Sequence, residues 1–192
     1  MRFSHPSSER GITLTEVLIA TFITVLLAAS ALHFYTTAHG QVIAQQEISD
    51  MQQINRACLE EISSGLRQAG YMLTGHPAYK IIGDSLYVFY HDINPVDTVL
   101  YFLREFTAAD YAAMIVNRPT DLHVYRLMKQ VNSDSAVTFA DFIKQVRYTV
   151  IDSRTVAVTL EVQTARADEV LQQYYGFRTF INTERVVLRN VS

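Results

Sequence analysis

Residues 10–32 read RGITLTEVLIATFITVLLAASAL, and this stretch decides the fold of the 192-residue chain. No Asp, Glu, Lys or Arg occurs among the 30 positions from Val17 to Gln46, and no Gly or Pro interrupts residues 12–39. Counted from residue 12, the apolar run is about 20 residues long, the length that a helix needs to cross a bilayer. A helix also satisfies its own backbone hydrogen bonds, as hydrocarbon requires. The sequence therefore predicts a membrane-spanning helix.

The flanking charges predict the orientation of this helix. Arg2 and Arg10 precede the apolar run, and the next basic residue is Arg56. Because basic residues are retained on the cytoplasmic side, the short N-terminus is expected in the cytoplasm and residues 40–192 on the other side of the membrane.

Three kinds of N-terminal segment compete at this point. An ordinary secretory signal has an apolar core of about 7–15 residues followed by a small-residue cleavage site, and this run is longer. A plain single-pass anchor would fit the length, but it does not explain Glu16. A carboxylate near the start of a membrane helix costs about 2–3 kcal/mol, so Glu16 either snorkels to the interface or has a partner or a function.

The residues around Glu16 resemble the leader of type IV prepilins and pseudopilins. In that family a glycine precedes the cleavage site, an apolar residue, usually Phe, follows it, and Thr-Leu, a variable residue and Glu come next. Ile12 stands in place of the commoner Phe, and Thr15 stands at a usually apolar position. The matching residues are Gly11, Thr13, Leu14 and Glu16.

The resemblance implies a processing reaction and an assembly mechanism. Prepilin peptidase would cut between Gly11 and Ile12 on the cytoplasmic face and would methylate the new amine of Ile12. Glu16 would then pair with the N-terminal amine of a neighbouring subunit, because a carboxylate in a low-dielectric filament core is far better opposite an ammonium than alone.

A helical pattern continues beyond the membrane segment. Its apolar positions recur at spacings of three or four residues, which predicts an amphipathic helix. Gly70 is a natural stop signal, and Gly65 within the pattern indicates a bend or close packing. The apolar positions are Ile48, Met51, Ile54, Cys58, Ile62, Leu66 and Ala69.

The remainder of the chain has strand patterns. Alternation on both sides of Asp152-Ser153 predicts a β-hairpin with one buried face. Residues 107–120 are expected to be irregular or a short helix, Asn94-Pro95 to be a turn, and residues 166–175 a polar connection. The expected strand segments are residues 86–90, 99–103, 122–128, 146–150, 156–162 and 177–188.

These patterns predict an α+β fold of the pilin type, with a long N-terminal helix whose second half packs on an antiparallel sheet. The expected organisation is a cleavable leader (1–11), an apolar transmembrane and assembly half of the helix (12–39), an amphipathic half (40–70) and a β-rich globular domain (71–192).

The sequence offers little for catalysis or for cofactor or metal binding. Six histidines are scattered without a metal-ligand spacing, and no phosphate loop or nucleophile motif occurs. His91 beside Asp92 could be an acid–base or metal pair or simply a strand end. Cys58 lies on the apolar stripe, where a buried hydrophobe and a redox or lipidation role both remain open. We expect no catalytic, cofactor-binding or metal-binding residues and no enzymatic activity.

Charge and composition narrow the partners. The net charge is −3 and no basic run occurs, so nucleic-acid binding is not expected. A single cysteine cannot form the C-terminal disulfide loop common in major pilins, which favours a minor pilin. The segments Leu66–Tyr71, Leu122–Met128 and Val187–Asn190 are similar to segments of PilW-like minor pilins.

The resemblance thus implies a minor pilin of a bacterial type IV pilus that helps to initiate or decorate the filament. The expected partners are prepilin peptidase, the major pilin, other minor pilins, the inner-membrane assembly platform and the lipid bilayer. Two alternatives stay open, which are a J-type minor pseudopilin of a type II secretion system and a membrane-anchored adhesin or ligand-binding module.

Overall fold

The computed structural model describes residues 13–91, 96–114, 123–165 and 176–190. Two helices lie in these ranges, α1 (Leu14–Gln68) and the short α2 (Ala108–Met114). The chain divides into two compact units, Met1–Ala44 and Gln45–Ser192. The strands of the described part are β1 (Tyr79–Ile82), β2 (Ser85–Tyr90), β3 (Asp97–Glu105), β4 (Tyr125–Val131), β5 (Val137–Asp152), β6 (Thr155–Gln163) and β7 (Thr179–Val187).

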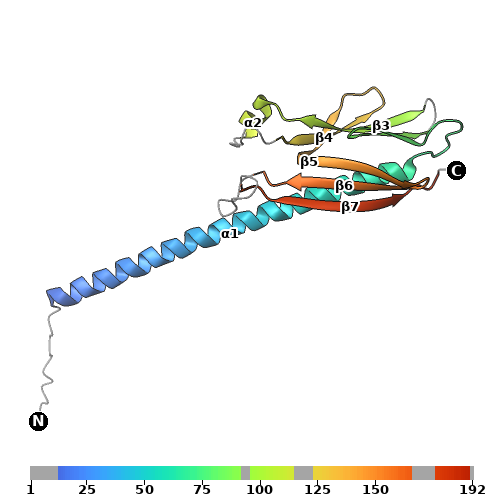
Figure 1. Cartoon of the computed structure of the whole chain (residues 1–192). Coiled ribbons are helices and arrows are strands. Elements are labelled where there is room, and N and C mark those ends of the chain that lie inside the picture. The colour runs from blue at the N-terminus through green and yellow to red at the C-terminus, as the bar shows by residue number, and fades with distance from the viewer. Residues whose placement is uncertain (1–12, 92–95, 115–122, 166–175, 191–192) are drawn as a thin grey trace, which may run out of the picture. The chain divides into compact units, whose positions relative to one another are not determined.

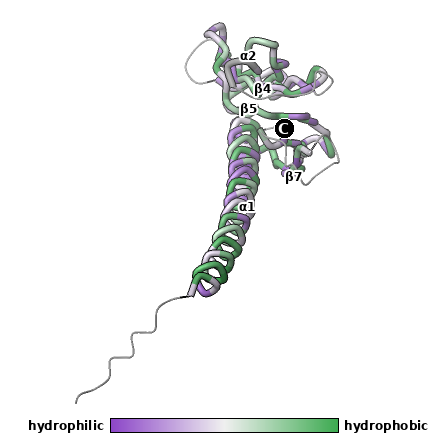
Figure 2. The backbone as a smooth tube through the Cα atoms, turned by 90° about the vertical axis from the view of Figure 1, so that its left-hand side faces the viewer, coloured by the Kyte–Doolittle hydropathy of each residue, from purple (hydrophilic) through white to green (hydrophobic). Residues whose placement is uncertain are grey.

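The first unit contains the N-terminal part of α1, which exposes its apolar side chains. Leu18, Phe22 and Val25 each leave more than half of their surface accessible. The helix is long and apolar enough to cross a membrane, and it is the one such helix in the described residues. In Figure 2 the green of hydrophobic residues predominates along this part of the helix. The first unit therefore carries a helical segment with exposed apolar side chains.

The second unit is built on one antiparallel sheet. Its strands follow in sequence order, and each pairs with the next from β1 to β7. Short connections such as Asp152–Thr155 make this order natural, because an antiparallel hairpin needs only a tight turn. The result is a meander with two edges, β1 and β7, and Figure 1 labels its strands from β3 to β7.

Strand β5 bends the sheet. Residues 137–140 pair with β4 and residues 145–152 pair with β6, whereas Ile143 pairs with both neighbours. Register shifts flank Ile143, and Phe142 has a φ of 61° in the left-handed region, which is costly for an aromatic residue. Bulges of this kind kink a strand and increase its twist. Figure 1 shows β5 leading from the part of the sheet with β3 and β4 into the part with β6 and β7.

The core lies between one face of this sheet and the C-terminal part of α1. Cys58, Ile62 and Leu66 are fully buried there. Helix α1 ends before Gly70, whose φ of 77° is the left-handed conformation that terminates helices. Gly65 allows close packing, because a Cβ at this position would lie 2.8 Å from the hydroxyl oxygen of Tyr101. The sheet residues of the core are Leu86, Val88, Val99, Tyr101, Leu127, Ile143, Val146, Val156, Val158, Leu160, Val162, Val186 and Leu188.

The α+β class, the long helix and the hairpin around Asp152 are confirmed, and several details differ. Strand β1 and the first half of β5 were not expected. Residues 179–187 form one strand. Val150 is 52% exposed rather than buried, and it lies next to the turn of the hairpin, where the register of β5 shifts. The turn expected at Asn94-Pro95 and the connection at 166–175 lie outside the described residues.

Candidate functional site

The start of α1 is closed by a reciprocal cap between Thr13 and Glu16. The backbone amide and the hydroxyl of Thr13 each donate to Oε2 of Glu16, both at 2.9 Å. The amide of Glu16 donates in return to the Thr13 hydroxyl at 3.3 Å. This arrangement is a capping box, in which two otherwise unpaired amides at a helix N-terminus are satisfied by side chains. The cap holds the Glu16 carboxylate at the first turn of the apolar helix.

The cap leaves the carboxylate able to accept further hydrogen bonds. The bonds from Thr13 end on Oε2, whereas Oε1 is not used by them, and Glu16 is exposed. A negative charge also suits this position, because the partial positive charge of a helix lies at its N-terminus. A cationic partner could therefore approach Glu16 without breaking the cap.

The polar residues within the apolar half of α1 are satisfied internally. Thr21, Thr24 and Ser30 donate their hydroxyl protons to backbone carbonyls one turn earlier, at 2.7–2.8 Å. Such bonding hides the hydroxyl groups from an apolar surrounding. These residues are thus compatible with a helix in lipid or among other apolar helices.

Of the residues expected to form the processing and assembly site, three are described. Thr13 and Glu16 meet in the capping box, and Leu14 opens the helix with 80% of its surface exposed. Gly11 and Ile12, which flank the expected cleavage point, lie outside the described residues. The structure thus brings Thr13 and Glu16 together.

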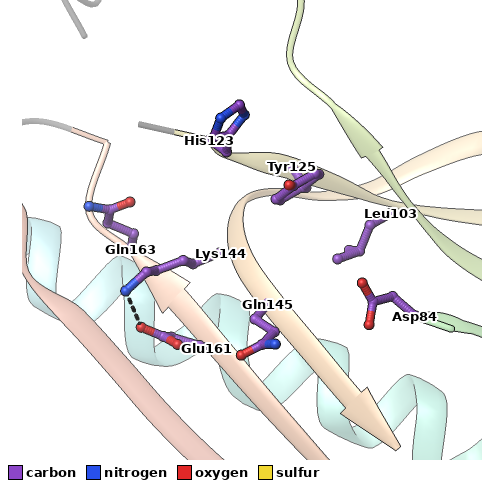
Figure 3. Close-up of a pocket in the computed structure, with 8 residues that line it drawn as sticks. All are labelled: Asp84, Leu103, His123, Tyr125, Lys144, Gln145, Glu161 and Gln163. Carbon is purple, nitrogen blue, oxygen red and sulfur yellow. Dashed lines mark hydrogen bonds and ion pairs between the residues drawn. The ribbon is translucent and has the colours of Figure 1, made fainter. Parts of the chain in front are cut away.

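A second candidate is an open groove of about 400 Å³ on the sheet, shown in Figure 3. Lys144 on its wall donates to Oε1 of Glu161 at 2.7 Å, and His123 contacts the carboxylate of Glu105. Because the lysine is paired with a carboxylate, it is not arranged as a free base or nucleophile. The groove is lined by Asp84, Leu103, His123, Tyr125, Lys144, Gln145, Glu161 and Gln163.

A charged cluster around Arg126 anchors α2 on the sheet. The Arg126 guanidinium donates to Asp110 at 2.6 Å and to Asp141 at 2.8 Å, and it lies over the ring of Phe106 at 4.7 Å. Hydrogen bonds from the amide and hydroxyl of Thr107, with the nearby Arg126 charge, lower the pKa of Asp110 to about 2. Every group of the cluster is matched by an opposite one, which indicates a structural role.

Several side chains under the sheet were not anticipated from the sequence. Asn55 is fully buried and donates to the carbonyl of Leu160 at 3.2 Å, so it joins α1 to β6. Glu61 accepts from Lys129 at 2.6 Å and from the Tyr101 hydroxyl at 3.1 Å. Asn55 lies four residues after Met51 and three before Cys58, so the helical spacing could have signalled its burial. The pairing of Glu61 with Lys129 has no local signal.

The described residues contain no cluster of metal ligands and no reactive thiol. No group of three or more His, Cys, Asp or Glu side chains is close enough there to hold a metal ion. Asp92, the neighbour of His91, lies outside the described residues. Cys58 is fully buried, and desolvation followed by the negative charge of Glu61 raises its pKa to about 12. A thiol in this state behaves as a small apolar side chain.

Comparison of the chain with models of protein families, with curated proteins and with solved structures found no match.

Proposed function

We propose that the chain is a type IV pilin-like subunit, most similar to PilW-like minor pilins, that takes part in assembling a pilus. The observation that carries this proposal is the acidic side chain of Glu16, capped by Thr13 at the first turn of an exposed apolar helix. A plain anchor would use this carboxylate only as a helix cap, whereas a subunit that must register against its neighbours also uses its negative charge.

The first proposed step is processing of the chain while the apolar half of α1 is held in the membrane. Residues 1–11 are removed by prepilin peptidase on the cytoplasmic side of the inner membrane, and Ile12 becomes the methylated N-terminus. The apolar half of α1 stays in the bilayer, and the sheet domain lies on the opposite side. The exposed apolar side chains of this helix can be covered either by lipid or by the apolar helices of other subunits. The same helix surface therefore suits both the membrane and the filament.

The second step is the transfer of the subunit into the filament. Glu16 pairs there with the positively charged amine of a neighbouring subunit, and the pairing sets the axial position of the two helices. The attraction is strong because both charges are shielded from water, and an unpaired carboxylate in that place would be costly. Partners are the major pilin, other minor pilins and the inner-membrane assembly platform.

The amphipathic part of α1 supports a structural rather than a catalytic role for the sheet domain. Its buried side is filled by side chains of the sheet, and Glu61 and Asn55 tie it to β4 and β6. Such a domain gives each subunit a rigid body attached to its assembly helix. The one cysteine, Cys58, leaves no possibility of an intramolecular disulfide and accords with a minor subunit.

The test is the maturation of substituted chains in cells with and without the peptidase. Gly11→Ala should abolish processing and leave a band of unshifted mass, whereas Gly40→Ala, at a helical position with no atom within 4 Å of an added Cβ, should mature normally. Glu16→Gln keeps the shape but not the charge, so it should be processed and yet enter filaments poorly. Normal maturation of Gly11→Ala, read by mass spectrometry of the N-terminus, would contradict the proposal.

A further inference from the structure

Strand β7 forms one edge of the sheet in the part of the chain that the structure describes. It pairs with β6 over nine consecutive positions without a register shift, from Thr155 opposite Val187 to Gln163 opposite Thr179. Within the described part of the chain, no strand pairs with its other side. Edge strands are often blunted by a proline, a bulge or charged side chains. Residues 179–187 contain no proline and no register shift, and their charged residues are Glu184 and Arg185.

The hydrogen bonds on either end of the β6–β7 ladder show which amides face outward. Thr164 donates to the carbonyl of Arg178, and Leu188 donates to that of Arg154. Both bonds connect an even-numbered position of the β7 segment to β6, and hydrogen-bonded pairs alternate along an antiparallel ladder. The odd-numbered residues of β7 therefore point their amides and carbonyls toward the open edge.

One outward amide already has a substitute partner. The amide of Thr183 donates to the side-chain carbonyl of its neighbour Asn182 at 2.9 Å. In a longer sheet this place is taken by a carbonyl of the next strand, so Asn182 satisfies an amide that an added strand would otherwise bind.

The exposed side chains of the odd-numbered residues of β7 include apolar and positively charged ones. Ile181 is 59% exposed and Val187 is 60% exposed, and Arg185 between them is exposed and forms no ion pair within the described residues. All three lie on the face of the sheet opposite α1, because the alternate residue Glu184 pairs with Arg67 of that helix at 3.1 Å. Two exposed apolar side chains thus flank one positive charge that has no ion pair among the described residues.

We propose that the β7 edge binds an extended segment of a different protein, not a second copy of this chain, and that the segment adds to the sheet as an eighth, antiparallel strand. The outward amides and carbonyls supply affinity, and the side chains select the partner. The partner segment carries an acidic residue opposite Arg185 and apolar residues opposite Ile181 and Val187. This binding is independent of the proposed role in pilus assembly, since it needs only the sheet.

The probe is a fluorescently labelled, acetylated peptide, Val-Thr-Glu-Lys-Thr-Thr-Ile-Thr, and the full chain in detergent micelles. Aligned antiparallel to β7, the peptide places its valine opposite Val187, its glutamate opposite Arg185 and its isoleucine opposite Ile181. Anisotropy should show saturable binding. A matched peptide with N-methyl groups on the amides of the glutamate and the isoleucine has the same side chains but lacks two donors, so it should not bind.

A charge exchange tests the position of the strand. Arg185→Glu should weaken the peptide about fivefold, as expected from replacing a favourable cross-strand charge pair by a repulsive one. A peptide with lysine in place of the glutamate should restore binding to this variant. Arg147→Glu is the matched control, because Arg147 is exposed on β5, two strands from the edge, and should leave binding unchanged.

Three results would overturn the proposal. The first is the absence of binding at millimolar peptide, and the second is equal binding of the N-methylated peptide. The third is pairing of β7 with the β7 strand of a second copy. In a Cys58→Ser background this pairing would give a disulfide-linked dimer of Glu184→Cys, whereas Asn182→Cys would give none. In an antiparallel pair of two β7 strands centred on position 184, only that position would face its own copy.

Discussion

Replacing Gly65 by alanine tests the packing of α1 on the sheet. An added Cβ would lie 2.8 Å from the hydroxyl oxygen of Tyr101 and 3.3 Å from a carbon of its ring. Tyr101 is 1% exposed, and its hydroxyl donates to Glu61 at 3.1 Å, so the ring cannot swing away freely. The substitution should therefore destabilise the second unit, although alanine favours helices over glycine.

The magnitude follows from three contributions. Overpacking of a filled core costs about 1–3 kcal/mol. Displacing the Tyr101 hydroxyl from Glu61 costs about 1 kcal/mol. The higher helix propensity of alanine returns about 1 kcal/mol. The free energy of unfolding should fall by about 1–3 kcal/mol in total.

The measurement is urea-induced unfolding of the full chain in micelles, followed by near-ultraviolet circular dichroism of the tyrosines. Gly40→Ala is the control, because nothing lies within 4 Å of its Cβ position, and it should leave stability unchanged or slightly raised. In a Tyr101→Phe background the nearest oxygen is gone, so Gly65→Ala should cost at least about 1 kcal/mol less than in the wild type. A Gly65→Ala chain as stable as the wild type would refute this account of the interface.

Three further predictions concern caps and the buried thiol. Thr13→Val removes the hydroxyl that donates to Glu16 and should reduce incorporation into filaments, whereas Thr13→Ser should preserve it, as measured by quantifying the subunit in sheared pili. Because the pKa of Asp110 is lowered to about 2, its contribution to stability is present above about pH 4 and is lost as the pH falls toward 2. Asp110→Asn should therefore lower Tm at pH 7, and the two melting temperatures should converge near pH 2; equal Tm values at pH 7 would contradict the role of the Thr107 cap. Cys58 should resist maleimide in the native chain at pH 7 and react within minutes in 8 M urea, and rapid labelling of the folded chain would disprove its burial.

Much of the fold could be predicted because its signals are local. The charge-free run from Val17 to Gln46 and the helical spacing of Cys58, Ile62 and Leu66 both predict a helix, and helix α1 includes both segments. Alternation on either side of Asp152 predicts the β5–β6 hairpin for the same reason, since side chains of a strand alternate between two faces.

The local geometry of the candidate site could be predicted from the sequence, but its function could not. Thr13 and Glu16 are three residues apart, so one helical turn suffices to bring them together, and the capping box could have been recognised from the sequence. The role of Glu16 toward a neighbouring subunit stays a prediction, because it depends on a second chain.

The sequence by itself determined the helix, its exposed apolar half, its cap and the hairpin, since each depends on residues a few positions apart. Only the tertiary structure decided the bend of β5 at Phe142, the pairing of Glu61 with Lys129 and the open edge at β7. These features join segments that are distant along the chain. Their partners are selected by packing and hydrogen bonding across the whole domain, and no local pattern records that selection.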